Sequence, residues 1–371
     1  MKHVLVTGGA GFVGSHLVDE LLAAGHRVRV FDNLTSQVHG VCIPEYLSSE
    51  AELVRGDMRD VDALHRALDG VEVVFNLAAA VGVGQSMYEI SHYMSVNTQG
   101  TANLLQGFLG RKCRVEKLIQ ASSMSAYGEG KYLCAQCGDV APGLRSTGQL
   151  RRKHWELECP RCRETLKPVP TDEGKPMQCS SIYALSKRDQ EEMTLLFGRT
   201  YAFPVVALRF FNIYGPRQAL SNPYTGVAAI FASRLLNGNA PLVFEDGKQM
   251  RDFVNVSDAV QALLLSMERT EADGHALNIG SGKPVSIGEV AEILAAALPG
   301  DIAPELTGKY RSGDIRHCFG DISAARNLLG YAPQVNLAEG MEDLVLWLRS
   351  QQPEDRAAEA TAHLSTFGLT A

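Results

Sequence analysis

The segment from His3 to His16, HVLVTGGAGFVGSH, decides the fold. Residues 3–7 are an apolar run with high β propensity, and glycines at positions 8, 11 and 14 follow directly. The stretch HLVDELLAAG then has the periodicity of an amphipathic helix, and VRVFD at residues 28–32 has the pattern of a second strand. Together these make a βαβ unit. Glycines at this place let backbone amides at the helix start approach a pyrophosphate, so the segment predicts a dinucleotide site.

Asp32 ends the second predicted strand, about twenty residues beyond the glycines. A carboxylate there accepts hydrogen bonds from both adenosine ribose hydroxyls and repels a 2′-phosphate, which favours NAD over NADP. Alternatively, Asp32 only caps the loop that follows it. Asp57, which ends the next predicted strand, either faces the adenine or begins a turn.

The alternation of strands and helices continues along the chain. Strand patterns at LVRGD (53–57), VEVVFNLAA (71–79) and KLIQASS (117–123) alternate with helix patterns near VDALHRALDG (61–70) and after Asn97. We therefore expect an α/β fold, a Rossmann-type doubly wound parallel sheet with helices on both faces.

The alternation breaks between about residues 131 and 170, where the chain becomes polar, basic and rich in cysteine. A long helix pattern resumes at residues 181–201, and a strand pattern follows it. The expected organisation is an NAD-binding Rossmann domain at 1–130 and 171–215, a zinc-ribbon-like insertion at 131–170, a mainly substrate-binding, smaller C-terminal lobe at 216–350, and a loosely held tail at 351–371.

The composition is that of a soluble globular protein, with 45% hydrophobic and 21% charged residues. No apolar run approaches the ~18 residues of a membrane span, and no basic and apolar leader is visible, so we expect a cytoplasmic protein with no membrane partner. The net charge of −7 argues against nucleic-acid binding, which generally needs a basic surface.

Tyr183 and Lys187 form a YxxxK pattern near the start of the long predicted helix. This spacing places both side chains on one helix face, one turn apart. A nearby ammonium favours the phenolate and lowers the pKa of a tyrosine, so Tyr183 is a candidate base near neutral pH. Ser123, at the end of the KLIQASS strand, is a candidate to hydrogen-bond the same substrate hydroxyl. On its own, YxxxK also occurs by chance, as a packed tyrosine and a solvated lysine.

Several motifs, taken in order, resemble the extended short-chain dehydrogenase/reductase family. They are TGGAGFVG, Asp32, NLAA, SVNTQGT, SSMSAYG, YALSK, LRFFNIYGPRQ and RDFVNVSD, and they span nearly the whole chain apart from the insertion. The resemblance implies a Rossmann-type domain that holds NAD and a C-terminal lobe that binds a nucleotide-diphosphate sugar. It also implies a homodimer built on a helix bundle that includes the YxxxK helix.

The resemblance assigns roles to individual residues. It implies that the catalytic residues are Ser123, Tyr183 as the base, and Lys187, which holds the nicotinamide ribose. The implied NAD-binding residues are Gly8, Gly11, Phe12, Val13, Gly14, Asp32, Asn33, Asp57, Met58, Leu77, Ala78, Ala79, Asn97, Ser122, Tyr183, Lys187 and Phe210. The implied substrate-binding residues are the diphosphate and nucleoside contacts Asn212, Arg251, Arg311 and Asp314, together with Val81, Gly82, Ser123, Ser125 and Phe244. Each arginine alternatively forms a surface ion pair.

Met124 and Ser125 bear on the type of reaction. In this family, 4,6-dehydratases have an Asp-Glu pair at these places, and decarboxylases have a Glu. Without a carboxyl group as a second acid or base, elimination of water has no evident catalyst, whereas 4-epimerisation through a transient 4-keto sugar needs none. We therefore expect an isomerase, an NAD-dependent nucleotide-sugar 4-epimerase. The alternatives are another epimerase or oxidoreductase of the family, such as one for UDP-hexoses or UDP-N-acetylhexosamines, and a non-catalytic NAD-binding scaffold.

Two departures from the family pattern bear on the sugar. Val81 stands where UDP-galactose 4-epimerases typically have a lysine, and Cys318 where some of them have a tyrosine. A roomier or more apolar pocket would suit a 6-deoxy or otherwise modified hexose. Ordinary packing is at least as good an explanation for Cys318.

Two CxxC pairs, Cys134 with Cys137 and Cys159 with Cys162, are separated by twenty-one residues. Such knuckles predict a tetrahedral site for a structural zinc, since four thiolates leave no open position for catalysis. Cysteine pairs at the same place resemble those of the dTDP-L-rhamnose 4-epimerases, a subgroup of the family, which makes a dTDP- or UDP-linked deoxyhexose the preferred substrate. The insertion is either a solvated loop or an element that folds over the sugar site.

Overall fold

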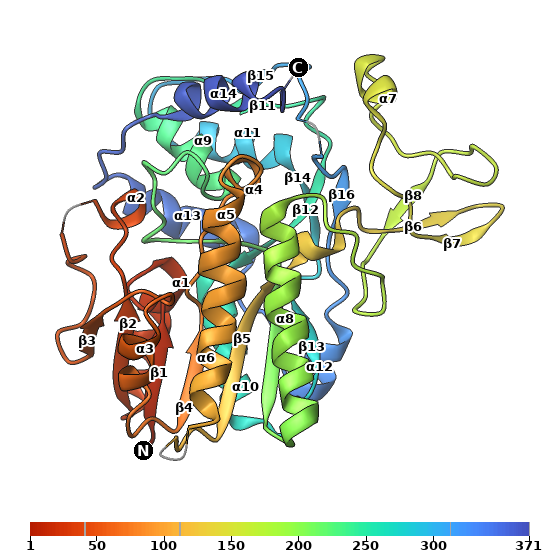
Figure 1. Cartoon of the computed structure of the whole chain (residues 1–371). Coiled ribbons are helices and arrows are strands. Elements are labelled where there is room, and N and C mark those ends of the chain that lie inside the picture. Colours follow the sequence, from red (N-terminus) through yellow and green to blue (C-terminus); the bar gives the residue numbers. More distant parts are fainter. Residues whose placement is uncertain (41, 111–112, 312, 371) are drawn as a thin grey trace.

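The computed structural model describes residues 1–40, 42–110, 113–311 and 313–370, and a seven-stranded parallel sheet lies at its centre (Figure 1). The predicted βαβ unit is present, because the first strand pairs in parallel with the second, with His3 opposite Arg27. The expected Rossmann-type fold is thereby confirmed. In spatial order the strands are β13 (Ala276–Ile279), β9 (Val205–Phe210), β5 (Lys117–Ser123), β4 (Val73–Asn76), β1 (His3–Thr7), β2 (Arg27–Asp32) and β3 (Glu52–Arg55).

Helices cover both faces of this sheet, as its largely apolar strands require. One face is covered by α3 (Val61–Ala67), α6 (Gly100–Phe108) and α8 (Ile182–Tyr201). The other is covered by α1 (Phe12–Ala23), α10 (Val256–Glu268) and α12 (Ser323–Leu329). Shorter helical segments follow strand ends or precede α6: α2 (Ser36–His39), α4 (Val83–Ser86), α5 (Ile90–Tyr93), the π-helical η1 (Met94–Gln99) and the 3-10 segment η2 (Met124–Tyr127).

The division of the chain differs from the boundary expected at residue 215. Strand β13 pairs with β9 in the central sheet, with Ala276 opposite Ala207, and α10 and α12 pack on the same sheet. All three elements fall within residues 216–350, which we assigned mainly to the substrate lobe. Strand pairing joins segments that are distant in the chain, so local patterns do not reveal to which sheet a late strand belongs.

The smaller lobe has its own apolar core, which includes Phe253, Leu294 and Leu344. Its helices are α9 (Val227–Leu236), α11 (Ile287–Ala297) and α13 (Leu337–Leu348). Strand β12 (Met250–Asn255) pairs with β10 (Asn212–Tyr214), β14 (Pro284–Ser286) and β16 (His317–Cys318). Strands β11 (Leu242–Val243) and β15 (Glu305–Leu306) form a separate two-stranded sheet.

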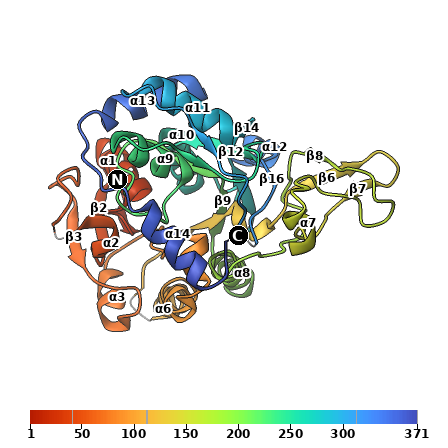
Figure 2. The ribbon, with the colours of Figure 1, turned by 90° about the horizontal axis from the view of Figure 1, so that it is seen from above.

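The insertion projects from the side of the molecule (Figures 1 and 2). It contains a three-stranded antiparallel sheet and one short helix, formed by β6 (Lys131–Cys134), β7 (Gly138–Val140), β8 (Lys167–Val169) and α7 (Thr147–Arg151). Its small core includes Tyr132, Leu157 and Leu166 beside the buried Cys134 and Cys159. The hydrophobic core of the insertion is thus small, and a small core of this kind generally needs a covalent or metal cross-link for stability.

The tail is not loosely held as expected. Helix α14 (Ala357–Thr366) buries Ala360 and Leu364, and Figure 2 shows it crossing the top of the molecule. The expectation failed because the helix is held by residues far away in the chain. Residue 371 of the expected tail lies outside the described residues. Within the described ranges, no helix has the length and apolar character needed to cross a membrane.

A buried ion pair joins helix α8 to the centre of the sheet. The Arg209 guanidinium on β9 donates to both carboxylate oxygens of Glu191 on α8, at 2.6–3.1 Å, and also to the Tyr127 hydroxyl at 2.7 Å. Ser122 at the end of β5 donates to the same carboxylate at 2.7 Å. Helix α8 is thereby held in place against β5 and β9.

Replacement of Arg209 by methionine should lower the free energy of unfolding by ~3–5 kcal/mol, because the Glu191 carboxylate would be left buried without its partner. Urea denaturation measures this loss. The matched control is Arg188→Met on the same helix, whose ion pair with Glu192 is exposed and should contribute less than ~1 kcal/mol. Equal small losses in both variants would contradict the assigned role of the buried pair.

Candidate active site

The glycine loop forms one end of a cavity of about 450 Å³ at the carboxyl edge of the sheet. Helix α1 starts at Phe12, directly after Gly11, so its free backbone amides face this cavity. Gly8 has φ of +68°, and a Cβ on Gly14 would lie 2.2 Å from the Gly8 carbonyl oxygen. A side chain at either position is therefore excluded, and the geometry suits the pyrophosphate of a dinucleotide.

Asp32 lies at the end of β2 on the wall of the same cavity and is 8% exposed. Its carboxylate accepts hydrogen bonds from the backbone N–H groups of Leu34, at 2.9 Å, and Ala10, at 3.1 Å. Asp32 therefore caps the following loop and still faces the cavity, so the two interpretations are compatible. Asp57 also lines the cavity, where bonds from Arg59 and Asn33 outweigh burial and hold the pKa of its carboxyl well below the usual value.

All but one of the residues expected to bind NAD line this cavity. The exception is Asn97, which is fully buried behind it. The Asn97 side chain accepts from the Ala80 N–H at 2.8 Å and donates to the Ala80 carbonyl and to Ser186. It therefore braces the loop after β4 against α8 rather than facing the cavity.

Sequence reasoning missed His39, at the end of α2. Its side chain is 3% exposed, lines the cavity and lies 3.9 Å from the Asp32 carboxylate. Burial lowers its pKa, and its Nδ1 atom has no hydrogen-bond partner among the described residues. No motif in the sequence singles out this histidine, because its place depends on how the loop after β2 folds.

Ser123, Tyr183 and Lys187 meet at the inner end of the cavity. The Lys187 ammonium donates to the Ala121 carbonyl at 2.6 Å, and burial lowers its pKa to about 7. Burial raises the pKa of Tyr183, and a hydrogen bond with Ser123 offsets only part of this effect. In this ligand-free site the pKa of Tyr183 is therefore raised, not lowered as the YxxxK spacing led us to expect, and burial is the cause.

A second cavity of about 340 Å³ continues from the first into the smaller lobe. Every residue expected to bind the substrate lines it. The two cavities share Ser123 and Tyr183, together with Val81, Phe210, Phe211, Asn212, Thr225 and Gly226. The catalytic candidates thus lie where a cofactor and a second ligand would meet. Cys318 is buried beside Met124, Tyr127 and Phe211 and does not line either cavity, which agrees with its interpretation as a packing residue.

The two arginines of the second cavity differ in their surroundings. The Arg251 guanidinium donates to the backbone carbonyls of Met250, Ile315 and Arg316. The Arg311 guanidinium lies 4.2 Å from the centre of the Phe244 ring, and its buried Nε has no partner among the described residues. Neither forms an ion pair within the described chain, so Arg311 in particular is available to an anionic ligand.

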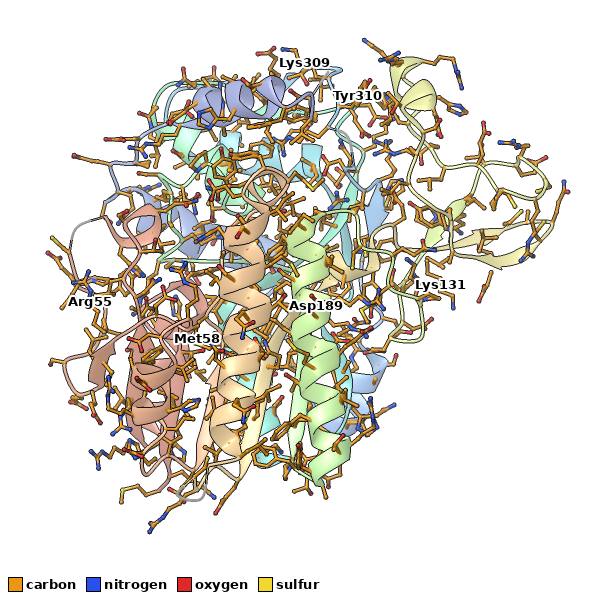
Figure 3. The ribbon with its side chains drawn as sticks, in the orientation of Figure 1. Arg55, Met58, Lys131, Asp189, Lys309 and Tyr310 are labelled. Atoms are coloured by element: carbon orange, nitrogen blue, oxygen red, sulfur yellow. The ribbon has the colours of Figure 1, made fainter. Side chains whose placement is uncertain are left out.

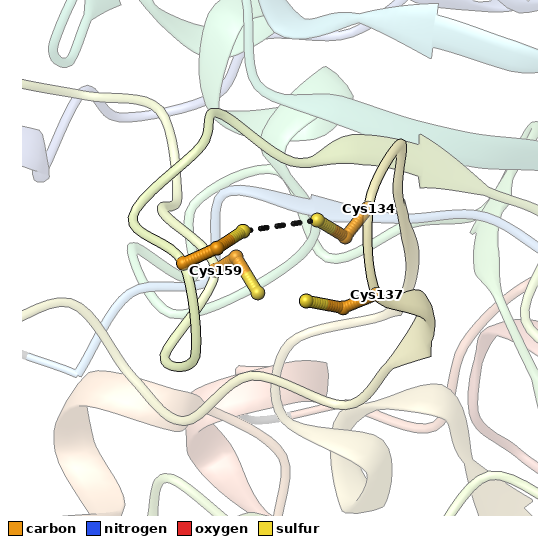
Figure 4. Close-up of side chains that lie close together, drawn as sticks. Cys134, Cys137 and Cys159 are labelled. Carbon is orange, nitrogen blue, oxygen red and sulfur yellow. Dashed lines mark hydrogen bonds between the residues drawn. The ribbon is translucent and has the colours of Figure 1, made fainter.

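The four paired cysteines form a cluster, with all their sulfur atoms within 4.8 Å of one another. Figure 4 shows the sulfurs of Cys134, Cys137 and Cys159 turned toward a common centre, and the Cys134 and Cys162 sulfurs are 3.4 Å apart. Tetrahedral Zn–S bonds of about 2.3 Å place sulfurs about 3.8 Å apart. The donor set therefore fits a zinc ion that is fully enclosed by thiolates.

A buried charge network joins the insertion to the second cavity. The insertion residue Arg145 pairs with Glu245 at 2.8 Å and donates to the backbone carbonyl of Asp314 at 3.1 Å. Arg316 pairs with the same Glu245 and with Glu156 of the insertion. Glu245 and Asp314 adjoin or form the cavity wall, so the insertion supports that wall from behind.

Comparisons with known proteins identify the family of this chain. Residues 4–142 and 162–280 match the model described as the NAD dependent epimerase/dehydratase family, and the gap between them lies inside the insertion. A relative named dTDP-L-rhamnose 4-epimerase, from Burkholderia thailandensis, is 35% identical over 353 residues, which cover 94% of this chain and 96% of that protein.

Two solved structures are also similar. UDP-glucose 4-epimerase from Thermotoga maritima, with UDP-glucose, has 31% identity and a TM-score of 0.77 over 94% of this chain and 98% of that one. UDP-glucuronic acid 4-epimerase from Bacillus cereus, in complex with UDP-glucuronic acid and NAD, has 25% identity and a TM-score of 0.73 over 94% and 99%. The family match covers more than half of the chain, and the protein therefore belongs to the NAD dependent epimerase/dehydratase family.

Proposed function

We propose that this protein is an NAD-dependent 4-epimerase of a nucleotide-diphosphate sugar, with a dTDP- or UDP-linked deoxyhexose such as dTDP-L-rhamnose as its preferred substrate. One observation carries the proposal. Ser123 and Tyr183 lie at the junction of the two cavities, and none of the described residues shared by both cavities is acidic. A hydroxyl placed there meets a base but no second acid or base for the elimination of water.

The residues that line the first cavity fit NAD. The loop of Gly8, Gly11 and Gly14 would hold the pyrophosphate, Asp32 the adenosine ribose and Lys187 the nicotinamide ribose. Bound NAD supplies a hydride acceptor that returns the hydride within the same turnover. Net oxidation of the sugar is then not expected, and the product differs from the substrate only in configuration.

Tyr183 takes the proton from the C4 hydroxyl as the C4–H bond breaks, and Ser123 hydrogen-bonds the oxygen that becomes a carbonyl. The 4-keto sugar would then turn within the pocket, so that its other face is presented to the cofactor site, and Tyr183 would return the proton to the oxygen. This needs a firm hold on the nucleotide and a loose hold on the hexose. Arg311, stacked on Phe244, provides the anchor, whereas the hexose end meets Val81 and Gly82.

The preference for a deoxyhexose rests on the apolar Val81 and on the similarity to the Burkholderia relative. Other relatives are named for UDP-glucose or UDP-glucuronate, so a UDP-hexose or UDP-N-acetylhexosamine is the second candidate. Product analysis separates these substrates.

The test is to incubate the purified protein, without added cofactor, with dTDP-L-rhamnose, UDP-glucose, UDP-galactose and their N-acetyl forms, and to identify the products by NMR. C4 epimers should form with no net NADH. Tyr183→Phe should lower turnover by ~10²–10⁴-fold, because the base is lost while the ring remains.

The matched control is Tyr201→Phe at the exposed end of the same helix, which should keep full turnover. Accumulation of NADH together with an oxidised sugar would show that the protein is an oxidoreductase and not an epimerase. NAD binding without turnover of any of these sugars would favour a non-catalytic scaffold.

We also propose that the four clustered cysteines hold one structural zinc ion and that the insertion positions the substrate wall. None of the eight cysteines, all of which lie in the described ranges, forms a disulfide, which fits a reducing, cytoplasmic location. The metal would hold β6 and the Cys159–Cys162 segment together. Arg145 and Glu156 lie in the chain between these two segments, and they pair with Glu245 and Arg316 of the smaller lobe.

Elemental analysis should find zinc in the purified protein. Cys159→Ser should lose it and raise the KM for the nucleotide sugar about tenfold, or ~1.4 kcal/mol, while NAD affinity stays unchanged. Cys42→Ser, an exposed cysteine outside the cluster, is the control and should keep the metal. Equal losses of NAD and sugar affinity would indicate general misfolding instead.

We also propose that the protein is a homodimer, with an interface formed by α8 and by the continuous helical segment of α5, η1 and α6. Helix α8 exposes Leu196 by 57%, and Ile90 on α5 is 50% exposed. Sedimentation velocity should show twice the chain mass, and Leu196→Asp should shift the protein toward the monomer. A monomeric wild-type protein would refute the dimer.

A further inference from the structure

We propose that the C-terminal segment, residues 353–370, forms an outer wall of the nucleotide-sugar site and that Ala360, Thr361 and Leu364 contact the bound substrate. The proposal rests on the proposed function of the second cavity as the sugar site. It assigns a role in substrate specificity to a segment that the sequence analysis predicted to be a loosely held tail.

One face of α14 borders the cavity. Ala357, Ala360, Thr361 and Leu364 all line it, and they have the spacing of a single helix face. The opposite face, with Ala358, Ala362 and His363, is exposed. Leu364 is 5% exposed although α14 lies at the molecular surface. Helix α14 therefore turns this one face toward the cavity that it covers.

Helix α14 lies against the segment that follows β4. A Cβ on Gly84 of α4 would lie 3.0 Å from a methyl group of Leu364, so the absence of a side chain there lets the two helices approach. The loop between β4 and α4 adjoins this contact. The same loop contains Val81, which also lines the first cavity with Tyr183. Leu364 thus closes the cleft beside the loop that leads to the catalytic candidates.

The chemistry of this wall is apolar. The one hydroxyl on the face, Thr361 Oγ1, donates to the Ala357 carbonyl at 2.8 Å and is already engaged within the helix. The wall therefore offers methyl groups and van der Waals contact rather than hydrogen bonds. Such a surface favours a sugar with an apolar substituent and disfavours a charged one, because a carboxylate there would lose its hydration without a partner.

The segment is attached differently at its two ends. At its start, Asp355 accepts from Arg234 and Asn239, and Asn237 donates to the Pro353 carbonyl. These bonds fix the segment to the end of α9.

At its far end, the Phe367 ring stacks on Tyr88 with centroids 4.9 Å apart, and Thr370 forms a single backbone bridge with Arg311. Phe367 is 59% exposed. Figure 3 places Lys309 and Tyr310, which precede Arg311, at the same end of the molecule as α14. The start of the segment is thus held by an ion pair and amide hydrogen bonds, and its far end by a stacked ring and one backbone bridge.

The first experiment compares Leu364→Ala with the matched control Leu346→Ala, which removes a 68% exposed leucine from α13. Calorimetry measures the binding of dTDP-L-rhamnose and UDP-glucose to NAD-loaded protein, and thermal denaturation checks that each variant is folded. Leu364→Ala should weaken nucleotide-sugar binding about tenfold and leave NAD binding unchanged, as expected for the loss of one buried apolar contact. Leu346→Ala should change neither.

Hydrogen exchange provides a second readout in the unmodified protein. Amides of residues 357–366 should become at least about tenfold more protected when the nucleotide sugar is added to the NAD-loaded protein. Unchanged protection of these amides, or unchanged binding in Leu364→Ala, would overturn the proposal.

Failure of the proposed function gives a different result. If wild-type protein binds a nucleotide sugar and protects α14 but does not epimerise it, the wall stands and the 4-epimerase assignment fails. If wild-type protein epimerises its substrate and Leu364→Ala binds it equally well, the wall fails and the assignment stands.

Discussion

The buried pair of Arg209 and Glu191 is the interaction on which the candidate active site depends. Two charges removed from water are tolerated here because the guanidinium and the carboxylate meet with several short hydrogen bonds, and Ser122 and Tyr127 complete the set. The pair ties α8 to the strands β5 and β9. Since Ser123 ends β5 and Tyr183 lies in the first turn of α8, this link sets the position of one candidate relative to the other.

Burial also sets the charge state of these groups. It lowers the pKa of Lys187 to about 7 and raises that of Tyr183, so the ligand-free site favours the neutral tyrosine. Bound ligands would change the surroundings of the Tyr183 hydroxyl and with them its pKa. Both adjoining cavities are lined by Ser123 and Tyr183. Ligands bound in the two cavities would therefore surround the tyrosine.

Two segments outside the Rossmann domain converge on the same lobe. The insertion supports the wall of the second cavity from behind through Arg145, Arg316 and Glu245, all of which are buried. The C-terminal helix α14 borders the same cavity from outside. The central fold thus carries the catalytic candidates Ser123, Tyr183 and Lys187, whereas peripheral segments border the second cavity. This fits a family in which one fold accommodates different sugars.

The sequence by itself determined the parts that rest on local patterns. The apolar strand of residues 3–7, the glycines that follow and Asp32 predicted the βαβ unit. The motifs that resemble the family implied the catalytic, cofactor and substrate residues, and all of these except Asn97 line the two cavities. Parallel strands all end at one edge of their sheet, so residues that follow different strands meet there without further information. The CxxC spacing similarly predicted a cluster that four sulfur atoms form.

Only the tertiary structure decided where β13 pairs, that Asn97 braces a loop, that Cys318 is a packing residue, and that the tail covers a cavity. It also decided that desolvation, rather than the Lys187 ammonium, governs the Tyr183 pKa. The physical reason is common to all of these. Each depends on which distant groups surround a residue, and neither the pairing of a late strand nor the loss of water around a side chain is encoded in its neighbours along the chain.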